Sequence, residues 1–368
     1  MKEYKRNDTI PERGKIIGEP KNPTRHGVVK AVGTHFEYQD GTIYYPIGTT
    51  IYALVHQEKT LYGQTMETLK SAPFNKVRFC IFPKHYDWNH NEPQLFPFEK
   101  SNGRWDTGKP CYAYWDFSNK NTTHVCVQTA EIRRSCELVT VYQKPVIIDE
   151  CGYEGNLEYD WGNLSGEEMT ENFWIAASRG AYCTHGETFL EHTSEEEVLW
   201  WSKGGTLKGE SWKRIQFLRN VLESLPGPLT FITEGYAQYP LEEIKKVAAM
   251  PKEERPIEFQ AGQYTKGLLC ANEEEIRKIK ENGRRNSSRY KDEVFLYYLG
   301  RRCPASLTME LPADNTYIFE VLDTWNMTRT IMEEEPIHMT EDHMANIYRI
   351  SLPGKPYMAV LARKTDKK

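Results

Sequence analysis

Residues 145–150, with the sequence PVIIDE, give the clearest indication of the fold class. Val146 to Ile148 form an apolar run without alternation, a pattern typical of a parallel strand covered on both faces. Two acids, Asp149 and Glu150, close the run, and a glycine-containing loop follows. In parallel α/β proteins the carboxyl ends of the strands carry the functional side chains. This stretch therefore predicts a parallel sheet and the place of its chemistry.

Strands and helices alternate on both sides of this stretch. Further strands are expected near Tyr45, Val77, Val125 and Tyr182. Amphipathic helices are expected at residues 58–71, 130–141, 165–179 and 211–225. This alternation is typical of βαβ units and predicts the α/β class, with a parallel sheet or barrel.

The pattern changes after Arg289, where short alternating strands are separated by turns. We expect them at residues 294–299, 306–311, 317–322, 347–352 and 357–362. Their spacing predicts a small antiparallel β-sandwich. The sequence thus divides into a polar lead segment (1–35), an α/β domain (36–240), a Lys-, Glu- and Pro-containing linker (241–288) and the sandwich (289–368).

Composition excludes several classes of protein. A formal net charge of -5 argues against a strongly basic nucleic-acid binder. No run of about 18 apolar residues predicts a membrane span, and residues 1–15 do not resemble a secretory signal. The eight cysteines show no C-x-x-C spacing and resemble neither a zinc framework nor a disulfide scaffold. Without a secretory signal, we expect reduced thiols and a cytoplasmic location. His85 and His90 lack the H-E-x-x-H pattern, so no metal site is expected.

The acid pair 149–150 is the strongest candidate for chemistry. A carboxylate at a strand end can act as nucleophile or general acid/base in glycosyl transfer. The alternative is a structural acid that caps a turn or pairs with an arginine. His185 and Glu187 follow another strand and share a face of it. They can point into a cleft or form a structural histidine–carboxylate pair.

A pair of tryptophans, Trp200 and Trp201, precedes a glycine turn. Indole rings offer a large flat surface for stacking against a sugar. The alternative is a pair of core residues beside a turn.

Several motifs together resemble the apiosidase-like glycoside hydrolase family. The motifs are Gly48-Thr49-Thr50-x-Tyr52, residues 72–78 (APFNKVR), 82–86 (FPKHY), 144–155 (KPVIIDECGYEG), 184–187 (THGE), 200–205 (WWSKGG), 323–327 (DTWNM) and 352–359 (LPGKPYMA). Members of this family are (β/α)8-barrel (TIM-type) enzymes, often with β-sandwiches at their ends.

The resemblance implies a retaining glycosidase whose nucleophile is Glu150, at the end of the seventh barrel strand. The implied substrate is a plant or microbial oligosaccharide or polysaccharide. Two carboxylates suffice for this reaction, so no cofactor is expected. Arg78 would hold a carboxylate or orient the catalytic acid. The sugar site would be lined by His56, His124, Gln128, Tyr153, His185, Trp200 and Trp201.

The second carboxyl group is the point of departure from the family. Members carry an Asn-Glu or similar acidic motif on the fourth barrel strand, and we find no matching motif here. Glu187, Asp149 or Glu154 would have to replace it, and of these Glu187 is our candidate for the second carboxylate. In a regular strand Asp149 points away from the face that carries Glu150.

Length points the same way, because a (β/α)8 barrel usually takes about 250 residues. The 185 residues from Gly41 to Leu225 offer only five strands. We therefore expect an incomplete barrel that lacks its third to fifth units, with residues 105–115 at the junction. The alternative to an active enzyme is a non-catalytic carbohydrate-binding relative or an inert truncated fragment.

Overall fold

The computed structural model of the chain describes residues 26–80, 98–101, 104–110, 118, 120–190, 203–232, 241–255, 286–333, 335–340 and 347–366. Trp200 and Trp201 lie outside the described residues. Of the expected junction at 105–115, only the backbone pairing of β7 (Arg104–Pro110) with β6 (Phe98–Ser101) is described.

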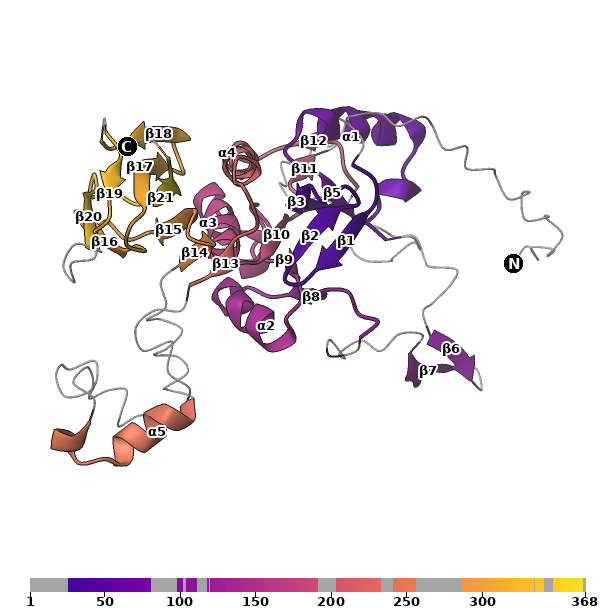
Figure 1. Ribbon diagram of the computed structural model, residues 1–368. Coiled ribbons are helices and arrows are strands. Elements are labelled where there is room, and N and C mark those ends of the chain that lie inside the picture. The colour runs from indigo at the N-terminus through magenta and orange to yellow at the C-terminus, as the bar shows by residue number, and fades with distance from the viewer. Residues whose placement is uncertain are drawn as a thin grey trace, which may run out of the picture.

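A five-stranded parallel sheet forms the centre of the α/β part (Figure 1). Its order is β5-β4-β10-β9-β8, and every neighbouring pair is parallel. The strands are β4 (Gly48–Thr50), β5 (Lys76–Arg78), β8 (Val125–Gln128), β9 (Val146–Glu150) and β10 (Tyr182–His185). Four of the five expected strands are therefore confirmed in place, and the fifth, expected near Tyr45, is β4, which begins at Gly48.

This sheet is curved into a half barrel. Arg78 of β5 lies 2.8 Å from Glu150 of β9, and Lys76 forms an ion pair with Asp149. The two strands are separated by β4 and β10, which in a flat sheet would place them about 14 Å apart. Side chains bridge this distance only because the sheet curves, so its concave face gathers residues from non-adjacent strands.

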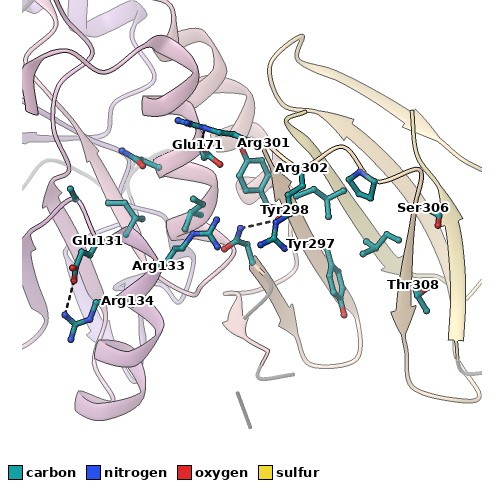
Figure 2. Close-up of a pocket in the computed structure, with 18 residues that line it drawn as sticks. Glu131, Arg133, Arg134, Glu171, Tyr297, Tyr298, Arg301, Arg302, Ser306 and Thr308 are labelled. Atoms are coloured by element: carbon teal, nitrogen blue, oxygen red, sulfur yellow. Dashed lines mark hydrogen bonds and ion pairs between the residues drawn. The ribbon is translucent and has the colours of Figure 1, made fainter. Parts of the chain in front are cut away.

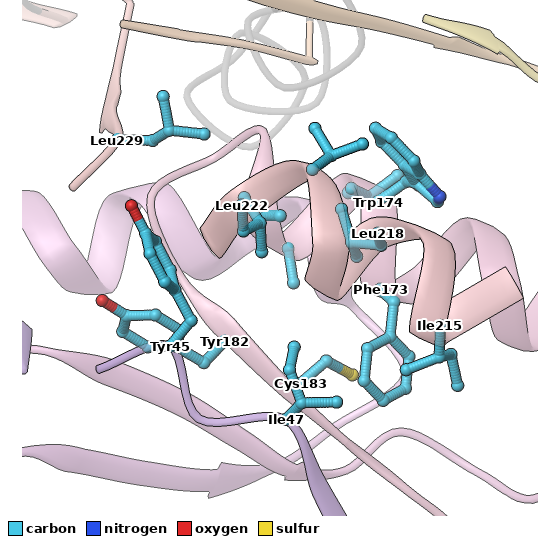
Figure 3. Packing of buried hydrophobic residues seen from close by; sticks show 14 of the residues in the cluster. Tyr45, Ile47, Phe173, Trp174, Tyr182, Cys183, Ile215, Leu218, Leu222 and Leu229 are labelled. Atoms are coloured by element: carbon cyan, nitrogen blue, oxygen red, sulfur yellow. The ribbon is translucent and has the colours of Figure 1, made fainter. Parts of the chain in front are cut away.

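Helices cover the convex face. They are α1 (Lys59–Ser71), α2 (Ser135–Tyr142), α3 (Gly166–Ala177) and α4 (Ser211–Glu223), with 3-10 turns at Leu54–His56, Ile132–Arg134 (η2) and Asp160–Gly162. A capping box starts α3: the Ser165 side chain accepts from the Glu168 backbone, and the Glu168 side chain accepts from the Ser165 backbone. Figure 3 shows Phe173 of α3 and Leu218 of α4 packed over Ile47 and Cys183.

A short antiparallel sheet closes the amino ends of the parallel strands. It consists of β1 (Val29–Val32), β2 (His35–Tyr38) and β3 (Ile43–Tyr44). Phe36 packs against Tyr182 and His124, with ring centroids 5.6 Å apart in both cases. Residues 29–35 of the expected lead segment thus belong to this sheet.

A separate antiparallel region follows, with the sheet order β13-β14-β15-β21-β17-β18 and with β19 paired to β17. β16 and β20 form a second, two-stranded sheet, whose Leu307 and Ile350 pack in one cluster with Phe295 of the larger sheet. The strands are β13 (Thr230–Phe231), β14 (Asn286–Tyr290), β15 (Val294–Gly300), β16 (Ser306–Glu310), β17 (Thr316–Asp323), β18 (Thr328–Ile331), β19 (Ile337–His338), β20 (Ile347–Ser351) and β21 (Met358–Lys364).

The two faces of β15 serve two cores, as the two-residue period of a strand requires. Phe295 and Tyr297 join a cluster with Leu307 of β16, whereas Leu296 and Tyr298 join the cluster of α3 and α4. Nine of the twelve residues of α3 are buried, so this helix is covered on more than one face.

Most expected elements match the structure, with informative differences. The first parallel strand begins at Gly48 rather than near Tyr45. Gly48 has no Cβ, and this lets it lie close to β10, because a Cβ there would be 2.6 Å from the Thr184 hydroxyl. The expected linker contains helix α5 (Leu241–Ala249) and a 3-10 turn at Lys252–Glu254. One further pair, β11 (Phe189–Leu190) with β12 (Thr206–Leu207), follows β10.

Candidate active site

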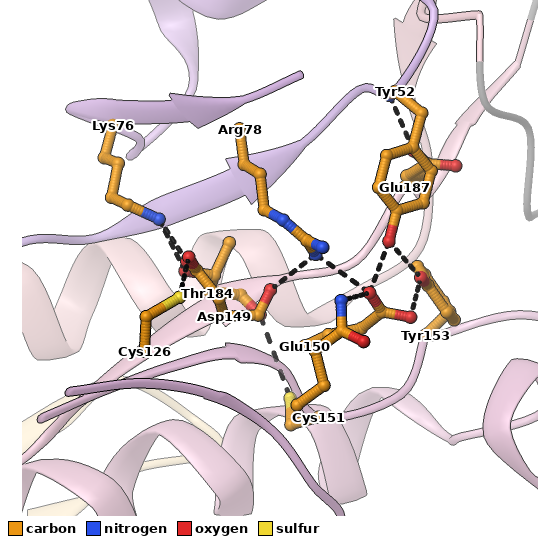
Figure 4. Close-up of polar contacts among 11 residues, drawn as sticks. Tyr52, Lys76, Arg78, Cys126, Asp149, Glu150, Cys151, Tyr153, Thr184 and Glu187 are labelled. Carbon is orange, nitrogen blue, oxygen red and sulfur yellow. Dashed lines mark hydrogen bonds and ion pairs between the residues drawn. The ribbon is translucent and has the colours of Figure 1, made fainter. Parts of the chain in front are cut away.

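Glu150 lies at the carboxyl end of β9 and accepts hydrogen bonds from four side chains (Figure 4). Arg78 donates at 2.8 Å and Gln128 at 2.9 Å, both to Oε2. The hydroxyls of Tyr52 and Tyr153 also donate, one to each carboxylate oxygen. In each of these four hydrogen bonds the carboxylate of Glu150 is the acceptor.

The four donors come from four places in the curved sheet. Arg78 ends β5, Gln128 ends β8, Tyr52 follows β4 by two residues, and Tyr153 lies in the loop after β9. All are at the carboxyl ends of parallel strands, where side chains of α/β proteins meet. The Arg78 guanidinium also lies 5.1 Å from the centroid of the Tyr52 ring.

The two tyrosines remain protonated across the neutral range. Burial, followed by the charge of Glu150, raises the pKa of Tyr52 well above its usual value. Burial also raises the pKa of Tyr153, and its neighbours Tyr52 and Glu150 add to the effect. Both hydroxyls therefore keep the proton that they donate to Glu150.

Asp149 has its own set of partners and lies on the same concave face. Lys76 forms an ion pair with it, Cys126 donates at 2.9 Å and Thr184 donates at 2.9 Å. Burial alone would raise the pKa of Asp149, but the Lys76 charge and these hydrogen bonds lower it below the usual value.

The expectation that Asp149 points away from Glu150 is wrong. Lys76 and Arg78 are two residues apart on β5 and share a face, and each contacts one of the two acids. The register between β8 and β9 is irregular there, because Val127 pairs with Ile148 whereas Gln128 pairs with Glu150. This irregularity lets successive side chains reach the same face.

Glu187 lies close to this cluster but is fully buried. Its Oε1 accepts a hydrogen bond of 2.7 Å from the backbone N–H of Tyr52, whose hydroxyl donates to Glu150. The two carboxylates thus contact opposite ends of one tyrosine. With no exposed surface, Glu187 does not reach a substrate in this conformation.

Glu154 caps a helix. Its carboxylate accepts from the backbone N–H groups of Glu210 (2.6 Å) and Ser211 (3.1 Å) and from the Ser211 hydroxyl. Ser211 begins α4, so Glu154 satisfies donors that would otherwise be unpaired and places a negative charge at the helix N-terminus. This is a structural role.

The structure gathers some predicted site residues and separates others. Arg78, Gln128 and Tyr153 meet at Glu150. His185 is fully buried, with its ring 5.0 Å from that of Phe74, and burial lowers its pKa to about 3.

His124 precedes β8 and lies at the opposite, amino end of the strands beside Phe36. The side chain of His56 is outside the description. Sequence reasoning proposed no role for Lys76, and it named Tyr52 only within a family motif. The sequence feature that could have identified Tyr52 as a site residue is its position two residues after the short strand β4.

An aromatic pair near Glu150, Trp161 and Tyr159, was not among the site residues expected from the sequence. Trp161 packs edge-on against Tyr153, with centroids 5.6 Å apart, and Tyr159 lies parallel to Trp161 at 5.6 Å. Their exposed fractions, 44% for Trp161 and 50% for Tyr159, leave ring surface open to a ligand. The pair extends outward from the Glu150 cluster along the loop after β9.

Two further observations concern the described residues only. They contain no group of three or more His, Cys, Asp or Glu side chains arranged to hold a metal ion. None of the helices in that part of the chain is long and apolar enough to cross a bilayer.

Comparisons with known proteins identify relatives of the fold. Residues 284–363 match a family described as a domain of unknown function, DUF5605. No curated protein matches the chain. A solved structure from Bacteroides vulgatus ATCC 8482, assigned to the glycoside hydrolases, aligns with a TM-score of 0.67 and 23% identity over 94% of this chain and 84% of its own.

Two more distant structures agree with this match. One, described as a glycoside hydrolase, has a TM-score of 0.54 and 9% identity over 93% of this chain and 98% of its own. The other, a family 5 glycoside hydrolase from Bacteroides vulgatus ATCC 8482, has a TM-score of 0.52 and 10% identity over 95% and 96%. The curved parallel sheet and the antiparallel region after it therefore form a glycoside-hydrolase-like fold.

Proposed function

We propose that the protein is a retaining glycoside hydrolase in which Glu150 is the nucleophile. The observation that carries the proposal is the arrangement at Glu150: a partly exposed carboxylate at a strand end, fixed by one guanidinium, two phenols and an amide. Such fixed donors hold a nucleophile in one orientation. The aromatic pair Trp161–Tyr159 adds a stacking surface beside it.

The proposed reaction proceeds in two steps. A Glu150 oxygen forms an ester bond with the anomeric carbon while the bond to the leaving oxygen breaks, and that oxygen takes a proton from solvent water. Water then attacks the anomeric carbon and gives a proton to the solvent, the ester bond to Glu150 breaks, and the sugar and the free carboxylate are released. The substrate class is a plant or microbial oligosaccharide or polysaccharide.

A second candidate is carbohydrate binding without turnover. It is favoured by the state of the three other carboxyl groups of the described site. Glu187 is fully buried, Asp149 pairs with Lys76, and Glu154 caps α4. None of the three is placed to protonate a leaving group, a contribution worth about 10²–10⁴-fold in rate.

The strand order supports the proposal of an incomplete barrel. With β4 as the first barrel strand, the order β5-β4-β10-β9-β8 corresponds to strands 2-1-8-7-6 of a closed barrel. The third to fifth units would fall between β5 and β8. In this proposal the antiparallel region is the sandwich that follows the barrel, as in apiosidase-like enzymes.

The decisive experiment uses substrates that need no general acid. A panel of 2,4-dinitrophenyl 2-deoxy-2-fluoroglycosides, pyranosides and furanosides, is incubated with the protein. The phenolate leaves unaided, and the fluorine slows release, so a nucleophile becomes trapped as an ester. Intact-mass analysis and peptide mapping then locate the adduct.

An adduct on Glu150 that is absent from Glu150→Gln and present in Glu223→Gln supports the hydrolase. Glu223 is a matched control on the surface of α4, paired with Arg219. Saturable oligosaccharide binding without an adduct supports the binding protein. An adduct in the Glu150→Gln variant contradicts the assigned nucleophile, and a protein that neither binds nor reacts contradicts both candidates.

A further inference from the structure

A cavity of about 820 Å³ lies between the α/β part and the antiparallel region, away from Glu150. Figure 2 shows its two walls: Glu131, Arg133 and Arg134 lie on one side, and Tyr297 and Arg302 on the other. The first wall is built by η2 and α3, and the second by β15, β16 and the turn between them. The volume of the cavity falls within the range of small-molecule pockets, which often form between domains.

The walls of this cavity carry more positive than negative charge, with four arginines and two glutamates among the lining residues. Two of the arginines are neutralised. Arg301 donates to Glu171 at 2.8 Å and to Glu168 at 3.0 Å, and Arg134 donates to Glu131 at 2.9 Å.

The other two arginines, Arg133 and Arg302, make no ion pair within the part of the chain that the structure describes. They come from opposite walls and repel each other. Burial lowers the pKa of Arg133; the charge of Glu171 opposes this effect and that of Arg302 adds to it.

A third guanidinium, that of Arg179, helps to hold residues of the cavity wall in place. The buried guanidinium of Arg179 donates to the backbone oxygen of Arg133 at 2.7 Å and to Asn286, another lining residue, at 2.8 Å. A cavity with two opposed guanidiniums suits a group that accepts several hydrogen bonds and carries negative charge. Phosphate and carboxylate oxygens match the fork of a guanidinium.

We propose that this cavity is a second binding site, which takes an oxyanion carried on a molecule of sugar size and clamps it between Arg133 and Arg302. The oxyanion can be the phosphate of a phosphorylated sugar or the carboxylate of an acidic sugar. The site is independent of the reaction at Glu150. Because it lies between the two parts of the chain, its occupation ties them together.

Isothermal titration calorimetry on the full chain in 150 mM NaCl tests the proposal with three probes: inorganic phosphate, glucose 6-phosphate and glucuronate. We expect saturable binding of at least one probe. Preference for glucose 6-phosphate indicates a phosphorylated sugar, and preference for glucuronate indicates an acidic one. Arg133→Gln and Arg302→Gln should each weaken binding at least about tenfold.

The matched control is Arg134→Gln, which removes a neighbouring charge that is already paired with Glu131. It should bind within about twofold of the parent, because at this salt concentration distant charges are screened. Glu150→Gln should bind normally, which separates this site from the proposed glycosidase site. The proposal is overturned if no probe binds, or if binding survives in the Arg133→Gln, Arg302→Gln double variant. Since both substitutions relieve repulsion, neither should lower the melting temperature.

Discussion

Arg78 donates a hydrogen bond of 2.8 Å to Glu150, although two strands of the sheet lie between them. This contact exists because the sheet is curved, and it fixes the carboxylate from the far side of the concave face. The proposed nucleophile therefore depends on a residue that lies 72 positions earlier in the chain.

Arg78→Ala should lower kcat/KM for an aryl glycoside by about 100-fold, because the carboxylate loses the donor that orients it. Arg78→Lys should fall between the parent and Arg78→Ala, since it keeps the charge and loses the planar fork. Steady-state kinetics measure both. Arg289→Ala, at an exposed arginine near Asp292, is the control. Equal rates for parent and Arg78→Ala would rule out the orienting role.

Asp149→Asn should destabilise the protein by about 1–3 kcal/mol at pH 7, because Lys76 loses its partner. The pKa of Asp149 is lowered in the folded state, so its contribution is complete above the unfolded value near 3.8 and is lost as the pH falls below it. Urea melts from pH 3 to 8 should show a gap between parent and variant that narrows only below about pH 4. A gap of constant size across this range would contradict the ion pair as its cause.

Buried His185 should make the protein less stable in mild acid. Burial lowers its folded pKa to about 3, so below pH 6.5 the unfolded chain binds a proton that the folded chain does not. Stability should therefore fall as the pH drops from 6.5 toward 3, and the neutral variant His185→Gln should show a flatter profile. Thermal melts of both proteins between pH 4 and 8 measure the difference. Parallel profiles would show that His185 is protonated in the folded state.

Glu154→Ala should cost about 2 kcal/mol of stability, because two backbone donors and a hydroxyl at the start of α4 lose their acceptor. The rate constant per folded molecule should stay unchanged. Chemical denaturation and active-site titration separate the two effects. A loss of turnover in fully folded Glu154→Ala would instead place this carboxylate in the chemistry.

Trp161→Ala should weaken oligosaccharide binding about threefold to tenfold and leave the melting temperature nearly unchanged. The ring is 44% exposed, so its removal opens no large cavity. Affinity electrophoresis in gels that contain soluble plant or microbial polysaccharides provides the measurement. Tyr62→Ala, on the exposed side of α1, is the control. Equal retardation of Trp161→Ala and parent would remove this ring from the binding surface.

Elements with a strong local signal were predictable from sequence. The apolar run at 146–148 became β9, and the amphipathic pattern at 211–225 became α4. Two-residue strands such as β13 and β19 carry too little pattern to be recognised, because pairing with a neighbouring strand defines them. The helix α5 lies in a stretch whose charge and prolines suggested a linker.

The site was predictable in part. Glu150 and Tyr153 could be predicted because they lie at or just after the end of the clear strand β9. Arg78 could be predicted because it ends β5, another strand with a strong sequence pattern. The register irregularity at β9 could not be foreseen, because it depends on pairing with β8. For this reason Asp149 was expected on the wrong face. His185 has the same pattern as a cleft residue, and only packing against Phe74 distinguishes it.

Helix α3 has a consequence for how the whole chain unfolds. Trp174 has no exposed surface, and its ring lies 5.6 Å from that of Tyr298 in the antiparallel region. Loss of that region would expose one side of α3 to water, and loss of the parallel sheet would expose the other. Neither half retains a complete core alone, so heating should produce a single calorimetric transition. A substitution that destabilises β15 should therefore also destabilise the carboxyl end of β9, because both unfold in the same cooperative transition, although no bond joins the two places.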